Sequence, residues 1–459
     1  FRHQLFQKYL YDRVDKVERA YLHDEVGNVL EKLYVDDSGE TAAIAPQLAR
    51  HYQEAGVADK AISYLLLAGE RAVQMSAYYE AIAHLNRGLE LLMSLPDSPE
   101  RAQQEIALRL VFGMAWIGIR GTPAPEVKAS YTRARELCQQ VGEASQLCRV
   151  LGELTFHHYV RAEHQSARDL AGQALGVARR ARDPLLIALG HWYLGVVLFA
   201  QGEYEMSRAH LGEVISRYDP ERHHRSFVAL HGADAGLSAL SYDACCLWSL
   251  GYPEQATSKS REALAMARTL GHPFTLADVL AYAGCMFDAM RRDGPALKYD
   301  AEELIRVSIG KVPAWSELGN RFQGLALILM GRVEEGMAEM RRGMSVGEAQ
   351  GVRCFFSGMI GYLAKAQAVT GQLKEGLRTL DEALFFVEET GERHWEAELY
   401  RRRGELLLMN GDSAASEAGL LKAIDVARGQ DAKSWELRAT IDLARMWQQQ
   451  GKGEEAKQV

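Results

Sequence analysis

Four glycines near the end of the sequence recur at intervals of 40 residues, and each follows an apolar helical pattern: Gly331, Gly371, Gly411 and Gly451. Counting back in the same steps reaches Arg291, within "RRDGPA", and then Gly251. Gly202 lies 49 residues before Gly251, which indicates about nine inserted residues, and one more step reaches Ala162. A fixed interval of this length is typical of a repeat protein, here with eight register positions.

Small residues recur at fixed distances from these breaks. Seven places before a break stand Gly195, Ala244, Gly284, Gly324, Ala364, Gly404 and Ala444, and twelve places after it stand Ala174, Ala263, Gly343, Ala383 and Ala423. Two helices of roughly 15 residues and two short turns fill a period of 40. We therefore expect each repeat to be an antiparallel helix pair whose backbones approach closely at the small residues.

The segment "LWSLGYPEQA" (247–256) shows how one break works. Gly251 can take the left-handed conformation that ends a helix. Pro253 suits the first turn of the next helix, where its missing N–H group costs nothing. One such hairpin cannot bury its apolar face alone, so neighbouring pairs must stack into a continuous core.

The sequence therefore predicts an all-α fold, a right-handed α-α superhelix. We expect residues 151–459 to form about eight of these units and residues 42–150 to form less regular helical hairpins. In the latter, "LPDSPE" (95–100) predicts a loop in which Ser98 caps the following helix. Contacts in such a solenoid run to immediate neighbours, which predicts an elongated open trough.

Composition limits the function classes. Of the 459 residues, 47% are hydrophobic and 25% charged, and the net charge of −8 argues against general nucleic-acid binding. The six cysteines form no C-x-x-C pair and are expected to be reduced thiols of a cytoplasmic protein. The longest apolar stretch, 185–200, has 16 residues and is predicted to be a buried repeat helix rather than a membrane span.

The period and the small-residue pattern resemble tetratricopeptide-type repeats in a longer form. Several segments also resemble the C-terminal helical-repeat region of bacterial STAND-class signal-transducing ATPases, in which an effector, often an adenylate/guanylate cyclase-like or DNA-binding domain, precedes the ATPase. They are "LARHYQEAGVADKAISYLLLAGERA" (48–72), "FAQGEYEMSRAHLGEVISRYDPERH" (199–223), "LGHPFTLA" (270–277), "RHWEAELYRRRGELLL" (393–408) and "AKSWELRATIDLARMWQQQGK" (432–452). Residues 1–41 look like the end of the winged-helix segment that precedes the repeats in that family.

The resemblance implies a sensor region that regulates an upstream P-loop ATPase. Because no G-x-x-x-x-G-K-[ST] motif occurs, ATP and Mg are expected only in an upstream domain, and the chain itself is expected to be non-enzymatic and without a cofactor. The chain opens on Phe1 without a helix-start signal, so we expect it to belong to a longer protein. A homo-oligomer would then form through the parent ATPase. The alternative is a general protein-interaction scaffold without a linked ATPase.

Candidate binding residues follow the repeat register. Tyr193, Tyr242, Tyr282, Phe322 and Tyr362 each stand nine places before a break. They either pack between repeats or line a concave groove that holds a protein, a peptide or a small-molecule inducer. By analogy with tetratricopeptide grooves, the concave side also receives Trp192, Phe199, Trp248, Arg321, Lys365, Arg401, Glu405, Arg438 and Arg445. The later repeats would thus favour an anionic ligand or an acidic peptide, unless these charges are merely solvated.

Two other motifs are weaker. His223, His224, His231 and Asp234 lie in the inserted stretch 216–236 and would be the ligands of a metal-dependent enzyme, but their spacing matches no known metal site, and we interpret the stretch as a solvated loop. "GMSVG" (343–347) matches the G-x-S-x-G motif, which makes a nucleophile of its serine only on a strand-to-helix turn. Because Ser345 falls within a predicted helix, we expect no catalytic role for it.

Overall fold

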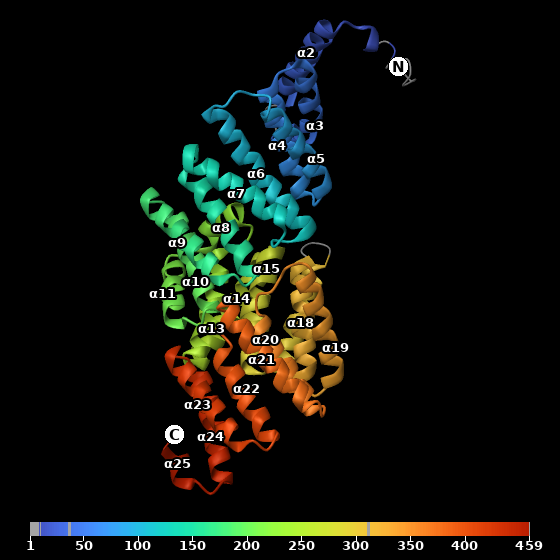
Figure 1. Ribbon diagram of the computed structural model, residues 1–459. Helices are drawn as coiled ribbons and strands as arrows, with labels where there is room; N and C mark the ends of the chain where they lie inside the picture. Colours follow the sequence, from blue (N-terminus) through green and yellow to red (C-terminus); the bar gives the residue numbers. More distant parts are fainter. Residues whose placement is uncertain (1–8, 10, 35–37, 310–312, 459) are drawn as a thin grey trace. The chain divides into compact units, whose positions relative to one another are not determined.

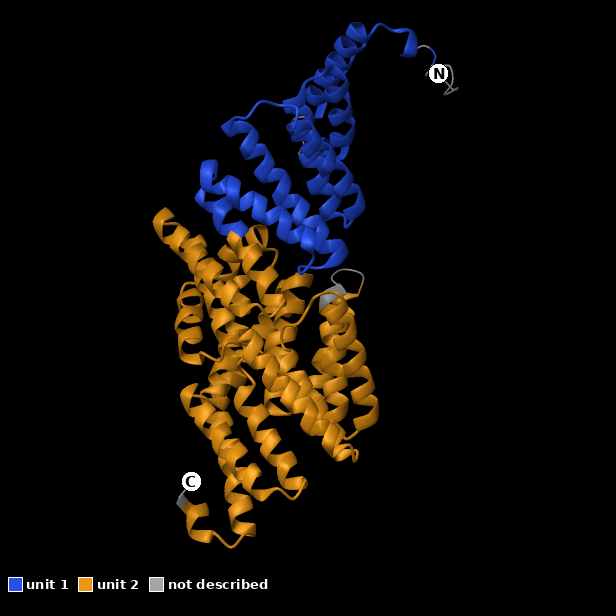
Figure 2. Cartoon of the chain, in the orientation of Figure 1, with its two compact units in different colours: residues 1–150 blue, residues 151–459 orange. Residues whose placement is uncertain are grey.

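The computed structural model describes residues 9, 11–34, 38–309 and 313–458, and in these residues every regular element is a helix (Figure 1). This confirms the predicted all-α fold. The chain divides into two compact units, residues 1–150 (unit 1) and residues 151–459 (unit 2), which are coloured separately in Figure 2. Among the described helices, none combines the length and the apolar character needed to cross a lipid bilayer.

Unit 1 is built from helices that pack against their neighbours along the chain. They are α2 (Lys16–Tyr34), α3 (Ser38–Ala55), α4 (Ala58–Gln74), α5 (Tyr78–Leu92), α6 (Pro99–Arg120), α7 (Pro125–Val141) and α8 (Ala144–Val160), which continues into unit 2. Ser98 caps α6 as expected, since its hydroxyl accepts a hydrogen bond from the Arg101 amide at 3.1 Å. In residues 1–41 the structure describes α2 and the start of α3, so the winged-helix origin of this stretch stays a prediction.

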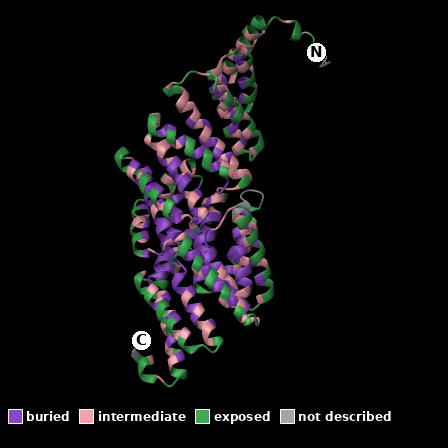
Figure 3. Ribbon diagram, in the orientation of Figure 1, coloured by how far each residue is buried: buried purple, intermediate pink, exposed green. Residues whose placement is uncertain are grey.

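Unit 2 continues with longer runs of paired helices, and its interior holds most of the buried residues in Figure 3. The helices are α9 (His164–Ala181), α10 (Pro184–Ala200), α11 (Tyr204–Ile215), α12 (Pro220–His231), α13 (Ala235–Ser249), α14 (Pro253–Leu270), α15 (Pro273–Val279), η1 (Leu280–Met286), α16 (Phe287–Arg291), α17 (Gly294–Ser308), α18 (Pro313–Leu329), α19 (Val333–Ala349), α20 (Phe356–Val369), α21 (Leu373–Thr390), α22 (Glu396–Met409), α23 (Ser413–Gly429), α24 (Lys433–Gln449) and α25 (Gly453–Gln458). Each register position separates the two helices of a pair, from α8 and α9 to α24 and α25.

The turns at the register positions share one hydrogen-bond pattern. At Gly251, for example, the amide donates to the Trp248 carbonyl at 3.1 Å, and the next amide, of Tyr252, donates to the Leu247 carbonyl at 2.9 Å. The same two bonds recur at Ala162, Gly202, Arg292, Gly331, Gly371, Gly411 and Gly451, all with positive φ. This pattern satisfies the last carbonyl groups of the first helix in each pair. It requires a residue in the left-handed conformation, which explains the recurrent glycines.

One break is displaced by a residue from its predicted position. The left-handed residue of the fourth pair is Arg292 (φ 63°) rather than Arg291. The first helix of that pair contains η1, a π-helical segment over Leu280–Met286. Because a π-helix takes more residues for each turn than an α-helix does, it accommodates one extra residue without moving the helix ends. A strict count of 40 residues could not show this expansion.

The small residues stand where the sequence placed them, at close helix crossings. A Cβ atom built on Gly324 would lie 2.6 Å from the Met340 backbone nitrogen and 2.9 Å from the Gly336 carbonyl oxygen. On Gly404 it would lie 2.9 Å from the Leu420 side chain. These distances leave no room for a methyl group, so the repeat pattern records the contact between the two helices of a pair.

Unit 2 departs from an open trough because helix pairs far apart in the sequence also make contact. The Val160 carbonyl at the end of α8 accepts hydrogen bonds from the Arg353 and Cys354 amides, at 2.7 and 3.0 Å. The Ala200 carbonyl at the end of α10 accepts from the Arg393 and His394 amides, at 2.8 and 3.2 Å. Helices α8 and α10 thus end against the starts of α20 and α22, each the first helix of the pair five positions later in the chain. The expectation of contacts between immediate neighbours alone is therefore wrong.

We predict that Gly324→Ala destabilises the protein by about 1–3 kcal/mol, because the new methyl group must displace backbone atoms of the facing helix. Gly172→Ala in α9 is the matched control, since a Cβ atom there would meet nothing within 4 Å. The control should stabilise the protein by up to about 1 kcal/mol through helix propensity. Chemical denaturation of both variants measures the difference, and equal effects would contradict the predicted crossing.

Candidate functional site

The aromatic side chains predicted for the groove lie in the interior of unit 2. Each is at most 7% exposed: Trp192, Tyr193, Phe199, Tyr242, Trp248, Tyr282, Phe322 and Tyr362. Within this series the ring centroids of Tyr242 and Tyr282 are 4.3 Å apart, and the Tyr242 hydroxyl is 3.2 Å from the Tyr159 hydroxyl. The arrangement agrees with the packing interpretation, and the expectation that these rings face an open groove is corrected.

The reason is the closure of unit 2 described above. Side chains from later pairs fill the space that an open trough would leave: the Phe355 ring lies 5.7 Å from Tyr282, and the His394 ring lies 5.5 Å from Phe199. Arg321, another predicted groove residue, is only 1% exposed and lies over the Phe356 ring at 5.3 Å. Burial lowers the pKa of Arg321, in agreement with its position in the core.

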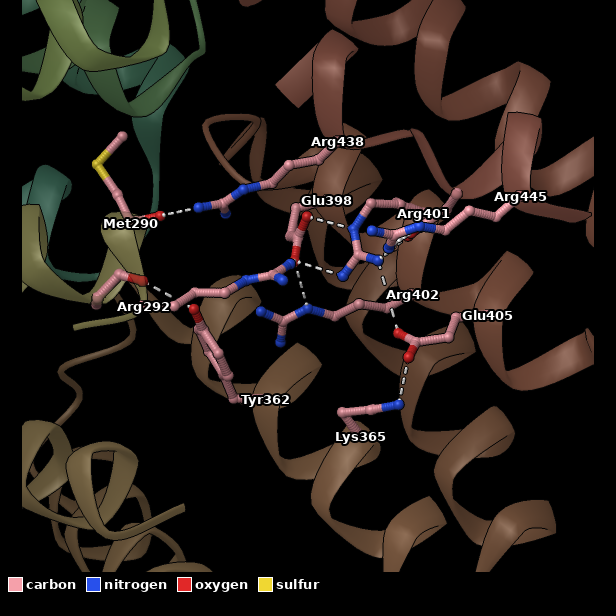
Figure 4. A network of polar contacts seen from close by, with 12 residues as sticks. Met290, Arg292, Tyr362, Lys365, Glu398, Arg401, Arg402, Glu405, Arg438 and Arg445 are labelled. Carbon is pink, nitrogen blue, oxygen red and sulfur yellow. Dashed lines mark hydrogen bonds and ion pairs between the residues drawn. The ribbon is translucent and has the colours of Figure 1, made fainter. Parts of the chain in front are cut away.

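The basic half of the predicted groove forms a compact group, which we call the arginine cluster (Figure 4). Its centre consists of Arg292, Glu398, Arg401, Arg402 and Arg438. Its edge consists of Lys365, Glu405, Asp442 and Arg445. Arg292 occupies the left-handed turn position of the fourth pair, while the other central residues come from α22 and α24. The cluster therefore lies where early and late pairs meet.

Glu398 holds the centre together. Its carboxylate accepts two hydrogen bonds from Arg401, at 2.7 and 2.9 Å, one from Arg402 at 2.9 Å and one from Arg292 at 2.6 Å. Burial by itself would raise the pKa of Glu398, but Arg401, Arg402 and Arg292 hold this pKa well below its usual range. Glu398 is thus a buried carboxylate that stays ionised because three guanidinium groups surround it.

The positive charge of Arg438 has less counter-charge around it than the charges of Arg401 and Arg402 have. One of its nitrogens donates to the Met290 carbonyl at 2.8 Å, and its guanidinium lies 4.8 Å from the Trp248 ring and 5.1 Å from the Trp435 ring. Burial lowers the pKa of Arg438 to about 10, an effect that Glu398 opposes and the nearby Arg292 increases. The cation–π contacts supply part of the missing counter-charge.

Two buried guanidinium nitrogens of the cluster have no hydrogen-bond acceptor among the described residues, Nη1 of Arg402 and Nη1 of Arg438. The Arg402 guanidinium lies 3.6 Å from the centre of the Tyr362 ring, whose hydroxyl donates to the Ala289 carbonyl at 2.8 Å. Unsatisfied buried donors are rare, and charged ones are costly. The cluster thus keeps donor capacity that its own carboxylates do not use.

The edge of the cluster reaches solvent. Arg445 is 72% exposed and Lys365 is 31% exposed, with Lys365 paired to Glu405 and Arg401 to Asp442. The structure therefore brings together Lys365, Arg401, Glu405, Arg438 and Arg445 from the predicted set, while it places Arg321 and the aromatic residues in the core.

Four residues of the cluster were not predicted from the sequence: Arg292, Glu398, Arg402 and Asp442. Arg402 and Glu398 carried a usable signal, because Glu398 precedes Arg401 and Arg402 by three and four residues, the spacing of neighbours on a helix face. Arg292 carried none, since its place depends on the π-helical expansion and on contact with a pair far along the chain.

The inserted stretch is helical, which corrects its interpretation as a solvated loop. Its histidines have structural partners: His224 contacts the Asp234 carboxylate at 2.8 Å, and His223 accepts a hydrogen bond from the Asp219 amide at 3.0 Å. His231 packs against Trp192, with ring centroids 4.4 Å apart. In the described residues, no three His, Cys, Asp or Glu side chains are placed to hold a metal ion.

Ser345 lies within α19, and the turn that would expose a nucleophile is absent there. Gly343 of the same motif has a packing role, because a Cβ atom on it would lie 2.8 Å from the Arg321 side chain.

A second polar group lies in the core of unit 2, around Glu392. Its carboxylate accepts hydrogen bonds from the Phe355 and Ser357 amides at 2.6 and 3.0 Å, and it lies 3.6 Å from His164. His394 is also buried, and its ring centroid lies 5.5 Å from that of Phe199 and 5.4 Å from that of Phe355. Burial lowers the pKa of His394 to about 4, although Glu392 opposes the shift.

Comparison with known proteins gives one curated relative and several solved structures of similar fold. No protein-family model matches the sequence. An uncharacterized protein of Rhizobium meliloti (strain 1021) is 24% identical over 452 residues, a match that covers 96% of this chain and 42% of that protein. The chain therefore spans about two-fifths of the length of that relative.

Two solved structures that follow a similar chain course are distant in sequence. The Rap conjugation gene regulator of plasmid pLS20, in complex with the Phr* peptide, has a TM-score of 0.48 at 14% identity, over 80% of this chain and 95% of that chain. A Signal Transduction ATPase with Numerous Domains with a tetratricopeptide repeat sensor, from Pyrococcus horikoshii, has a TM-score of 0.43 at 13% identity, over 90% and 69%. The eight helix pairs of unit 2 give the chain a tetratricopeptide-like helical-repeat fold.

We predict that Glu398→Gln destabilises the protein by about 3–5 kcal/mol, because it leaves three guanidinium groups without their shared counter-ion. Glu405→Gln at the edge of the same cluster is the control and should change stability by less than about 1 kcal/mol. The free energies of unfolding of the two variants test the order, and a reversed order would show that Glu398 does not hold the cluster.

The state of His394 predicts a pH dependence. The unfolded state binds a proton on this residue below about pH 6.5, whereas the native state resists protonation down to about pH 4. His394 therefore contributes stability above pH 6.5 that is lost as the pH falls towards 4. His394→Phe keeps the ring contacts and removes the titrating group, so its melting temperature should fall less than that of the wild type between pH 7 and pH 4.5. Parallel pH profiles would contradict the assignment.

Proposed function

We propose that this chain is a non-enzymatic binding module whose arginine cluster recognises an anionic ligand, either a small inducer or the acidic segment of a protein partner. The supporting observation is the charge of the cluster. It contains six basic side chains against three acidic ones, and two of its buried guanidinium nitrogens have no acceptor among the described residues.

The geometry favours an anion that approaches from the edge. Arg445 and Lys365 at the edge have 72 and 31% of their side-chain surface accessible, and Arg292 of the centre has 36%. A carboxylate or phosphate that reached Arg438 would supply the counter-charge that Glu398 does not, and guanidinium groups bind such anions with paired hydrogen bonds. Its binding should weaken with ionic strength, because part of the cluster is exposed to solvent.

The role of this binding rests on the resemblance to signal-transducing ATPases. We propose that ligand binding to the arginine cluster changes how the repeats contact an upstream P-loop ATPase and its effector, within a longer cytoplasmic protein. The coding sequence before Phe1 tests this part directly. A G-x-x-x-x-G-K-[ST] loop there supports the regulatory role, whereas its absence from the gene leaves the general interaction scaffold.

The binding site itself is tested by isothermal titration of the chain with a hexaglutamate peptide at low ionic strength. We predict that Arg438→Met weakens binding at least about tenfold, the loss expected for one charge-assisted contact. Arg403→Met is the matched control, because Arg403 lies on the same helix but pairs with Asp381 outside the cluster. Equal affinity of the wild type and both variants, or no measurable binding of the peptide and of inorganic phosphate by the wild type, would rule out the site.

A further inference from the structure

Helix α2 of unit 1 turns several polar side chains towards α3 and α4, beside the apolar Leu30 and the buried Gly27. Of the residues of α2 that face α3 and α4, Glu31 accepts hydrogen bonds from Tyr52 and Tyr64, at 2.7 and 2.6 Å, and pairs with Lys60 at 2.6 Å. His23 contacts His51 at 2.9 Å. The packing of α2 onto its neighbours thus uses charge and hydrogen bonds as well as apolar contact.

The opposite face of α2 is apolar and exposed. Leu22, Val26, Val29 and Leu33 are 45, 42, 56 and 69% exposed. Their separations of four, three and four residues place all four in one stripe along the helix, and this is the spacing of the seam between two packed helices. The stripe points away from α3 and α4, so α2 has a second packing surface that the described residues leave uncovered.

The charges beside the stripe indicate what fits it. Glu25 and Lys32 are both exposed and flank the same side of the stripe. If a second α2 lies antiparallel on the first, about a two-fold axis between Val26 and Val29, the apolar residues face one another in pairs, Leu22 with Leu33 and Val26 with Val29. In this arrangement Glu25 of each helix lies beside Lys32 of the other, about 3 Å apart along the axis, given a rise of about 1.5 Å for each residue. In this arrangement the stripe is therefore complementary to itself in its apolar positions and in its charges.

We propose that α2 is a self-association surface, on which a second copy of this chain docks through an antiparallel α2–α2 seam. The two-fold arrangement lets one patch serve both partners, as closed dimers require. The seam is short, with four apolar residues on each side, and an interface near the low end of the usual size range forms a weak, concentration-dependent dimer. The proposal is independent of the anion site in unit 2.

Sedimentation equilibrium of the full chain, from about 1 to about 300 µM, tests the seam, because an interface of this size gives dissociation constants in the micromolar range. We expect a monomer–dimer equilibrium that Val29→Asp abolishes. Leu437→Asp is the matched control, since Leu437 is an equally exposed apolar residue, 60% accessible, on α24 of unit 2. A wild type that stays monomeric throughout the range, or a dimer that Leu437→Asp weakens as strongly as Val29→Asp does, would overturn the proposal.

A charge exchange tests the antiparallel register. Glu25→Lys and Lys32→Glu should each weaken the dimer several-fold, because each places like charges side by side. The double variant Glu25→Lys/Lys32→Glu should restore the wild-type dissociation constant, since both pairs are re-formed with reversed sign. If the double variant dimerises no better than the single ones, the antiparallel seam is wrong.

Discussion

The structure of unit 2 depends on the need to satisfy the carbonyl groups at the ends of its first helices. Within each pair, the left-handed turn satisfies two of these carbonyl groups, because two amides of the turn donate hydrogen bonds to them. At Val160 and Ala200 the requirement is also met from outside, by backbone amides that belong to pairs five repeats later. These bonds join distant parts of the chain, so the repeats close on themselves instead of forming an open trough.

The contacts between distant helix pairs determine which side chains are buried in unit 2. Rings that would line a concave groove in an open solenoid, such as Tyr242 and Phe199, become core residues that pack on Tyr282 and His394. Polar groups that are buried in the same interior need hydrogen-bond partners, and the Glu392 carboxylate accepts hydrogen bonds from the Phe355 and Ser357 amides. In the arginine cluster the cost of burying charge is met by Glu398, whose carboxylate is shared by three guanidinium groups.

The repeat register predicted some residues of the arginine cluster and not others. Counting from the breaks placed Lys365, Arg401, Glu405, Arg438 and Arg445 on one surface, and the structure brings these residues together. The count could not find Arg292, because a π-helical segment displaces its turn by one residue. Nor could it tell Arg321, alone in the core, from Arg401, which has the same register position but a carboxylate three residues before it.

The sequence by itself determined the helix pairs, their turns and the sites of close backbone approach, because these depend on local residue types: glycine for a left-handed turn, proline for a helix start, a small residue at each crossing. The tertiary structure alone decided which faces are buried, since pairs five repeats apart meet only when the small rotations between neighbouring pairs accumulate into a full turn. The accumulated rotation is not encoded at any one position. The sequence therefore showed a row of aromatic residues, but not whether solvent or another repeat lies against that row.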